Sequence, residues 1–190
     1  MKRILDVLLG RSRPQPLRDE RLFAISTAQV TLEARLRLRP SGRAGLCFRP
    51  VEASRFQEAE AEVRGMLDVA GRAAETRVEV HPDTYGFLWI VLEDPDFEDL
   101  VAAAHMATQT LRERGFGEQV LAVVFGFVDE NGQPVYWVYN YKRGAFYPFA
   151  PRGPRQRDNA LELRLGATME RELPVDPEHE RWYALWDLPV

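Results

Sequence analysis

The chain has 190 residues, of which 45% are apolar and 28% charged, and its formal net charge is −4. This is the composition of an ordinary soluble globular protein, and no stretch approaches the roughly 18 uninterrupted apolar residues of a membrane span, so a transmembrane protein is excluded. The acidic balance argues against a nucleic-acid partner. The single cysteine, Cys47, excludes an internal disulfide bond and a cysteine-cluster metal site.

Residues 1–16 are expected to form a short amphipathic segment and a linker, and residues 17–190 a single α+β domain. The apolar residues between Ile4 and Leu9 suit two turns of helix, which is too short to be stable alone. Residues 1–10 must therefore dock on this protein, on a partner, on a second copy in a homodimer, or peripherally on a membrane. Because no small-residue cleavage site follows, we expect a cytoplasmic protein whose lipid contact, if it has one, is at the inner face of the membrane.

Residues 26–38 carry two conflicting patterns. Ser26 and Gln29 have the spacing of a capping box, which favours a helix, whereas apolar and polar residues alternate from Val30 to Leu38 as in a strand. We predict a helix, because residues 38–42 have the composition of a helix stop followed by a turn.

From Arg43 onward, strand and helix patterns follow in a regular order. Strands are predicted over 43–51, 76–80, 87–92 and 120–128, and helices over 54–71 and 94–115. This is the βαββαβ order of a ferredoxin-like antiparallel sheet. One more strand, over 134–141, follows the hairpin signal Asn131-Gly132, and Asp158 or Asn159 caps a final helix. The predicted fold is thus α+β, a ferredoxin-like sheet extended by an extra strand and flanked by N- and C-terminal helices.

The segment 142–157 is a basic island in an acidic chain, since it holds five cationic side chains and no acid. We predict a partner-binding surface here, because arginine forks suit carboxylate or phosphate groups. Its candidate residues are Lys142, Arg143, Phe146, Tyr147, Arg152, Arg155, Arg157 and Asp158. Two alternatives stay open: the cations are solvated or pair internally with Asp158, Glu162 and Glu170, or a ligand site lies beneath the loop with Arg143, Arg155 and Asp158 as its polar groups.

Gly144 can adopt the positive φ of a tight turn, so the chain should reverse there and lay Phe146, Tyr147 and Phe149 against the sheet. The prolines that follow would then hold the arginines as a pre-organised basic edge. If the aromatic residues support the fold and the arginines bind a partner, Phe146→Ala should destabilise the protein. Replacing both Arg155 and Arg157 with alanine should barely change the melting temperature and should weaken partner binding.

No catalytic or metal-binding pattern is present. His81, His105 and His179 lie far apart in the sequence, and there is no nucleophile elbow or phosphate-binding glycine loop. The acids from Asp94 to Asp99 have the positions expected at a helix start. We therefore expect no enzyme activity, no metal and no cofactor.

Several segments together resemble the PspA-associated protein family called PspAB. They are Phe23–Thr27, Thr31–Glu33, Gly42–Pro50 (GRAGLCFRP), Asp83–Trp89 (DTYGFLW), Tyr139–Phe149 (YNYKRGAFYPF), Arg157–Leu163 (RDNALEL) and Arg181–Trp186 (RWYALW). The resemblance implies a cytoplasmic protein that works beside PspA, a membrane-remodelling coiled-coil protein of the bacterial envelope-stress (phage-shock) response. It implies no catalytic residues.

Two functions are therefore expected to compete. The first is a non-catalytic adaptor or regulator that binds PspA or a companion stress protein. The second is a small-ligand-binding domain or small enzyme with its site under the 142–158 loop.

Overall fold

The computed structural model describes residues 20–49, 57, 58, 61, 63, 65 and 76–190. The predictions for residues 1–16, and those for most of the helix expected over 54–71, lie outside the described residues.

In the described part of the chain, six strands form one antiparallel sheet in the order β2-β3-β1-β4-β5-β6. The strands are β1 (Arg39–Phe48), β2 (Arg77–Pro82), β3 (Leu88–Glu93), β4 (Val120–Val128), β5 (Pro134–Asn140) and β6 (Ala145–Phe149). The part β2-β3-β1-β4 has the strand order of a ferredoxin-like sheet, which confirms the predicted fold class. The sheet continues beyond β4 through β5 and also through β6, one strand more than expected.

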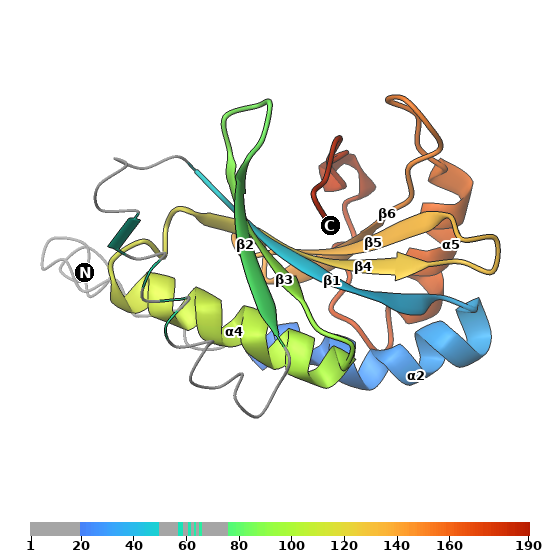
Figure 1. Ribbon diagram of the computed structural model, residues 1–190. Helices are drawn as coiled ribbons and strands as arrows, with labels where there is room; N and C mark the ends of the chain where they lie inside the picture. The colour runs from blue at the N-terminus through green and yellow to red at the C-terminus, as the bar shows by residue number, and fades with distance from the viewer. Residues whose placement is uncertain (1–19, 50–56, 59–60, 62, 64, 66–75) are drawn as a thin grey trace, which may run out of the picture.

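The helical elements are η1 (Glu20–Phe23), α2 (Ala24–Leu36), α4 (Phe97–Glu113), α5 (Asn159–Met169) and η2 (His179–Arg181). Helices α2 and α4 cover one face of the sheet, and α5 lies at the end that carries β6 (Figure 1). The last residues of the chain run over the opposite face (Figure 1). No helix among the described residues is long and apolar enough to cross a membrane.

The predicted helix over 26–38 is confirmed as α2, but its ends differ from the prediction. It begins earlier, at Ala24, and its N-cap Phe23 makes no side-chain hydrogen bond, while Gln29 donates to Glu33 instead of closing a capping box. Arg37 ends the helix in the left-handed region at φ 54°, and β1 begins two residues later. The turn expected over 38–42 is instead a bulged start of β1, where Gly42 has φ 77°.

The two faces of the sheet carry separate cores because successive side chains of each strand point to opposite sides. The helix-covered face holds large aromatic side chains that are at most 1% exposed: Phe125, Phe127, Trp137, Tyr139 and Phe146. The opposite face holds Trp89, Val124, Val138 and Phe149, packed against residues of the segment 182–190. We call this segment the C-terminal strap.

Two glycines seat the strap on the domain. A Cβ atom at Gly45 of β1 would lie 2.6 Å from Cγ2 of Val190, and one at Gly166 of α5 would lie 2.6 Å from Cη2 of Trp182. Any side chain at either position would push the strap away. The hydroxyl of Tyr136 also donates to the carbonyl oxygen of Val190 over 3.2 Å.

The hairpin predicted at Asn131-Gly132 and the chain reversal predicted at Gly144 both form. In the β4–β5 turn, one carboxylate oxygen of Asp129 accepts from the backbone N–H groups of Asn131 and Gln133, each at 2.8 Å, and Gly132 has φ 74°. In the β5–β6 turn, Gly144 has φ 66° and its N–H donates to the carbonyl of Asn140 over 2.8 Å. The predicted reversal at Gly144 is confirmed, and it creates β6.

Candidate functional site

Residues 151–157 form a closed turn between β6 and α5, which we call the basic turn. The N–H of Arg152 donates to the carbonyl of Gln156 over 2.7 Å, and Pro151 pairs with Arg157 in an isolated β-bridge. Just outside it, the N–H of Asp158 donates to the carbonyl of Ala150 over 2.8 Å. The turn projects from the body of the domain (Figure 1). These backbone hydrogen bonds fix the conformation of the turn.

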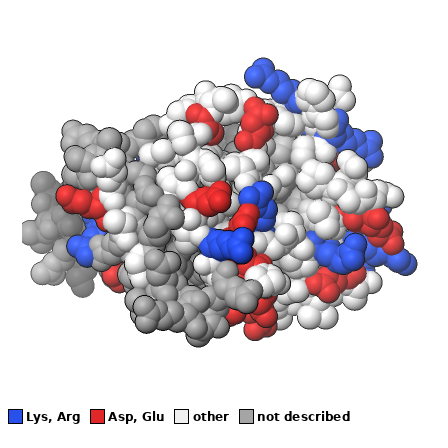
Figure 2. Space-filling view, in the orientation of Figure 1, with Lys and Arg blue, Asp and Glu red and all other residues white. Residues whose placement is uncertain are grey.

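Two arginines of the basic turn face solvent. The Arg152 side chain is 71% exposed and one of its Nη atoms lies 2.6 Å from Oδ2 of Asp158. The other carboxylate oxygen of Asp158 caps α5 by accepting from the N–H of Leu161 at 3.0 Å. Arg155 is exposed, and no described residue forms an ion pair with it. Figure 2 shows Lys and Arg side chains at the upper right of the molecule, beyond the sheet end that carries α5.

Arg157 was expected on an exposed basic edge, but its guanidinium points into the domain. Its Nε lies 2.8 Å from Oε2 of Glu162, a carboxylate whose side chain is only 2% exposed, and its Nη1 donates to the carbonyl of Trp182 over 2.6 Å. The guanidinium carbon also lies 5.5 Å from the ring centre of Phe149. Arg157 is thus an internal partner of Glu162, one of the alternatives that the sequence left open.

The remaining predicted residues divide in the same way. Phe146 is fully buried and Tyr147 is 3% exposed, so both support the fold. Lys142 and Arg143 are exposed at the β5–β6 turn. The five residues of β6 separate them from the basic turn, a distance of roughly 17 Å. The island that is continuous in sequence is therefore split into two patches in space, and its role in partner binding stays a prediction.

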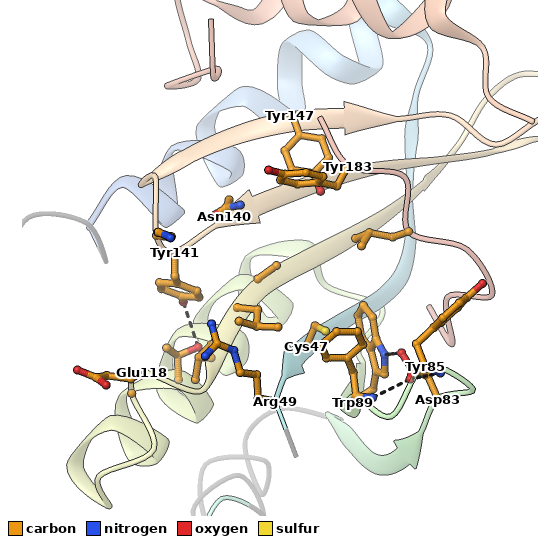
Figure 3. A pocket seen from close by; sticks show the side chains of 18 of the residues that line it. Cys47, Arg49, Asp83, Tyr85, Trp89, Glu118, Asn140, Tyr141, Tyr147 and Tyr183 are labelled. Atoms are coloured by element: carbon orange, nitrogen blue, oxygen red, sulfur yellow. Dashed lines mark hydrogen bonds between the residues drawn. The ribbon is translucent and has the colours of Figure 1, made fainter. Parts of the chain in front are cut away.

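A cavity of about 1220 Å³ lies on the strap-covered side of the sheet. Its lining includes Cys47 on β1, Trp89 on β3, Ala122 on β4 and Tyr147 on β6. Residues 183–186 of the strap and the turn between β2 and β3 add further lining, and α4 contributes Thr108 and Arg112. Figure 3 shows Tyr147 and Tyr183 close together, and Cys47 and Trp89 in a second group.

The charged groups of the cavity are unequally available. Asp83 is already engaged: its Oδ1 accepts from the N–H groups of Tyr85 and Phe87, each at 2.8 Å, and its Oδ2 accepts from Nε1 of Trp89 at 3.0 Å (Figure 3). Arg49 is exposed, and its guanidinium pairs with no residue of the described chain. Arg49 is thus a cationic group of the cavity that is available to a ligand.

Burial keeps the thiol of Cys47 and the phenol of Tyr147 protonated. It raises the pKa of the Cys47 thiol to about 12, with a smaller contribution from the charge of Asp83. It also raises the pKa of the Tyr147 phenol above its usual value. Neither group is an anion near neutral pH, so neither is a ready nucleophile or base.

Cys47 is expected to resist alkylation in the folded protein. Only the thiolate reacts, and at pH 8 a thiol of pKa 12 is ionised on the order of a thousandfold less than one of pKa 8.5. Iodoacetamide labelling followed by mass spectrometry should therefore be at least about 100-fold slower in the native protein than in urea. Equal rates in the two states would contradict this burial.

The same pKa gives the sign of a stability change. Between about pH 8.5 and 12, the unfolded thiol releases its proton while the folded thiol retains it, so stability falls as the pH rises through this window. In the Cys47→Ala variant, the free energy of unfolding should therefore fall less between pH 7 and pH 10 than in the original protein. Urea unfolding at a series of pH values measures this difference.

Sequence reasoning missed most of the cavity. Of the eight predicted residues, Lys142 and Tyr147 line it, whereas Arg143, Arg155 and Asp158, the polar groups expected around a ligand, do not. The expected ligand site with these three polar groups therefore stays a prediction, and the cavity is a different candidate site. The available signal was the concentration of aromatic residues in three separate stretches: 85–89, 139–147 and 182–186.

Fold and site together define an extended ferredoxin-like α+β domain with an open, partly aromatic cavity and a projecting basic turn. The family model of PspAB, described as PspA associated protein B, matches residues 2–190, and the chain belongs to this family. A search of curated proteins and a search of solved structures found no match. Membership therefore links the chain to the PspA system.

Proposed function

We propose that the protein is a non-catalytic adaptor or regulator of the PspA envelope-stress system, and that it acts by binding PspA or a companion stress protein. Membership of the PspAB family supports the link to this system. The observation that carries the proposal is the basic turn, which combines a shape fixed by backbone hydrogen bonds with two exposed arginines. A pre-ordered loop loses little conformational entropy on binding, so its charges contribute more fully to affinity.

The backbone of Arg155 supports the same role. Arg155 has φ 51°, in the left-handed region where a side chain other than glycine costs roughly 1 kcal/mol. Glycine adopts this backbone conformation at a lower energy than arginine does. The stability of the fold therefore does not require an arginine at this position. A contact of the exposed guanidinium with a partner would account for an arginine here.

The proposal is tested by titrating the protein with purified PspA in a calorimeter. Arg152→Glu combined with Arg155→Glu should weaken binding at least about tenfold, because it replaces two attractive charges with repulsive ones. The matched control is Arg35→Glu combined with Arg164→Glu, which makes the same charge change at two exposed helix positions. This control should bind like the original protein. Equal losses in the two double variants would mean that only net charge matters and that the basic turn is not the site.

Arg155→Gly separates binding from folding. It relieves the positive-φ backbone, so its melting temperature should be unchanged or higher, while its affinity for PspA should fall. An affinity equal to that of the original protein would remove Arg155 from the interface. No detectable binding of the original protein at tens of micromolar PspA would count against direct contact with PspA and leave the companion protein as partner.

The predicted location and further contacts are part of the same proposal. A cytoplasmic position beside PspA, peripheral membrane contact through residues 1–10 and a homodimer are all compatible with it. Deleting residues 1–13 should change liposome binding or oligomeric state. If neither changes, these two contacts are wrong while the adaptor role stands.

A further inference from the structure

We propose that the cavity beneath the C-terminal strap binds an amphipathic anion, a molecule with an apolar chain or ring and one carboxylate, phosphate or sulfonate group. This goes beyond the adaptor role, because it concerns a different face of the molecule and a small ligand. The proposal rests on the apolar lining, on the distribution of charge around it, and on one hydroxyl of the lining that bonds to no described residue.

The lining suits an apolar body. Cys47, Trp89 and Ala122 are each no more than 8% exposed, and Leu185 and Trp186 of the strap are partly buried beside them. Ligand sites are commonly apolar clefts of roughly 300–1,000 Å³, and the volume here, about 1220 Å³, exceeds that range. This volume is sufficient for an acyl chain or a ring system.

Tyr147 supplies an independent indication of a ligand. Its side chain is 3% exposed and lines the cavity, yet its hydroxyl forms no hydrogen bond with the described residues. The hydroxyl therefore has hydrogen-bonding capacity that no described residue uses. The phenol keeps its proton, as its raised pKa indicates, so it can donate to an oxygen atom of a bound molecule.

The charge around the cavity selects the sign of the head group. The cationic lining residues are Arg49, Arg112 and Lys142, of which Arg112 and Lys142 interact with other residues of the protein, and the acidic ones are Asp83 and Glu118. The oxygens of Asp83 are already used by the turn between β2 and β3, which leaves Glu118 as the exposed acid. An anionic head beside Arg49 is therefore favoured over a neutral or cationic head.

The test compares three soluble probes with the same ten-carbon chain: decanoate, decanol and decyltrimethylammonium. Calorimetry on the full chain should show decanoate binding about tenfold more tightly than the cationic probe, with decanol between them. Arg49→Glu changes an exposed residue and should erase or reverse this preference. If all three probes bind equally well, or if Arg49→Glu leaves the preference intact, the proposed head-group site is wrong.

A second variant tests the place of the apolar chain. Ala122→Trp fills the cavity from β4 and should weaken decanoate binding at least about tenfold. Ala34→Trp, the same change at an exposed position of α2, is the matched control and should leave binding unchanged. Circular dichroism checks that both variants fold, and if Ala122→Trp does not fold, Arg49→Glu decides the test. Retained binding in a folded Ala122→Trp variant would place the chain elsewhere and overturn the proposal.

A vesicle experiment separates the two sources of such a ligand. Monomeric decanoate should compete with a fluorescent fatty-acid probe, whereas vesicles of anionic phospholipid should not displace it, because Cys47, Trp89 and Ala122 of the apolar lining are buried. Displacement by vesicles alone would identify a membrane surface instead of a single amphiphile and overturn the proposal.

Discussion

Arg157→Ala is expected to lower the free energy of unfolding by about 3–5 kcal/mol, because it leaves the buried carboxylate of Glu162 without its counter-charge. The Glu162 side chain is 2% exposed, and Arg157 reaches it through both Nε and Nη2. The substitution also removes the bond to the carbonyl of Trp182. Urea unfolding followed by circular dichroism measures the loss.

This result would revise the expectation that Arg155 and Arg157 can be replaced together at little cost. Arg155→Ala alone is the control and should change stability by no more than about 0.5 kcal/mol, as is usual for an exposed side chain. Adding Glu162→Gln to Arg157→Ala should restore part of the loss. It removes the buried charge while keeping an acceptor for the N–H of Ala150, which donates to Glu162 over 2.8 Å. An Arg157→Ala variant as stable as the Arg155 control would show that the ion pair contributes nothing.

Phe146→Ala is expected to cost about 3–4 kcal/mol, because it empties a fully buried site in the aromatic core. The Phe146 ring lies 4.7 Å from the ring centre of Tyr139, and the backbone N–H and carbonyl of Phe146 also bond to the segment after α5. Differential scanning calorimetry would show the loss as a lower melting temperature.

Phe23→Ala is the matched control for this prediction. Phe23 is 39% exposed and packs on His105 with ring centres 4.7 Å apart, so its loss should cost no more than about 1 kcal/mol. Equal costs for the two substitutions would mean that the β6 side of the core is loosely packed.

The sheet could be predicted from sequence because its signals are local. Asn131-Gly132 and Gly144 mark hairpin turns, and the side-chain periodicity between them decides which residues pair. The start of α2 was placed two residues late, because a preceding 3-10 turn carries the chain into the helix without a side-chain cap. Strand β6 was missed, although the reversal at Gly144 and the packing of the aromatics were expected. The strand contains Pro148, and proline disfavours a strand prediction because it has no backbone N–H to donate to a neighbouring strand.

The site could be predicted only in part, because its partners are distant in sequence. Arg157 and Glu162 are five residues apart and were anticipated as one possible pair, but the bond from Arg157 to Trp182 depends on the path of the strap. The cavity brings together five stretches of chain between Cys47 and Trp186. No spacing rule connects such stretches, since their proximity follows from the strand order β2-β3-β1-β4-β5-β6.

Arg157 gives the basic turn and the cavity a common support. It closes the turn by pairing with Pro151, and its guanidinium holds the carbonyl of Trp182 at the start of the strap that covers the cavity. A ligand that shifts the strap would therefore act on the conformation of the turn, and a partner bound to the turn would act on the affinity for the ligand by the same factor. Partner binding by the adaptor would then depend on the concentration of an amphipathic anion. Arg157 would couple ligand binding in the cavity to partner binding at the basic turn.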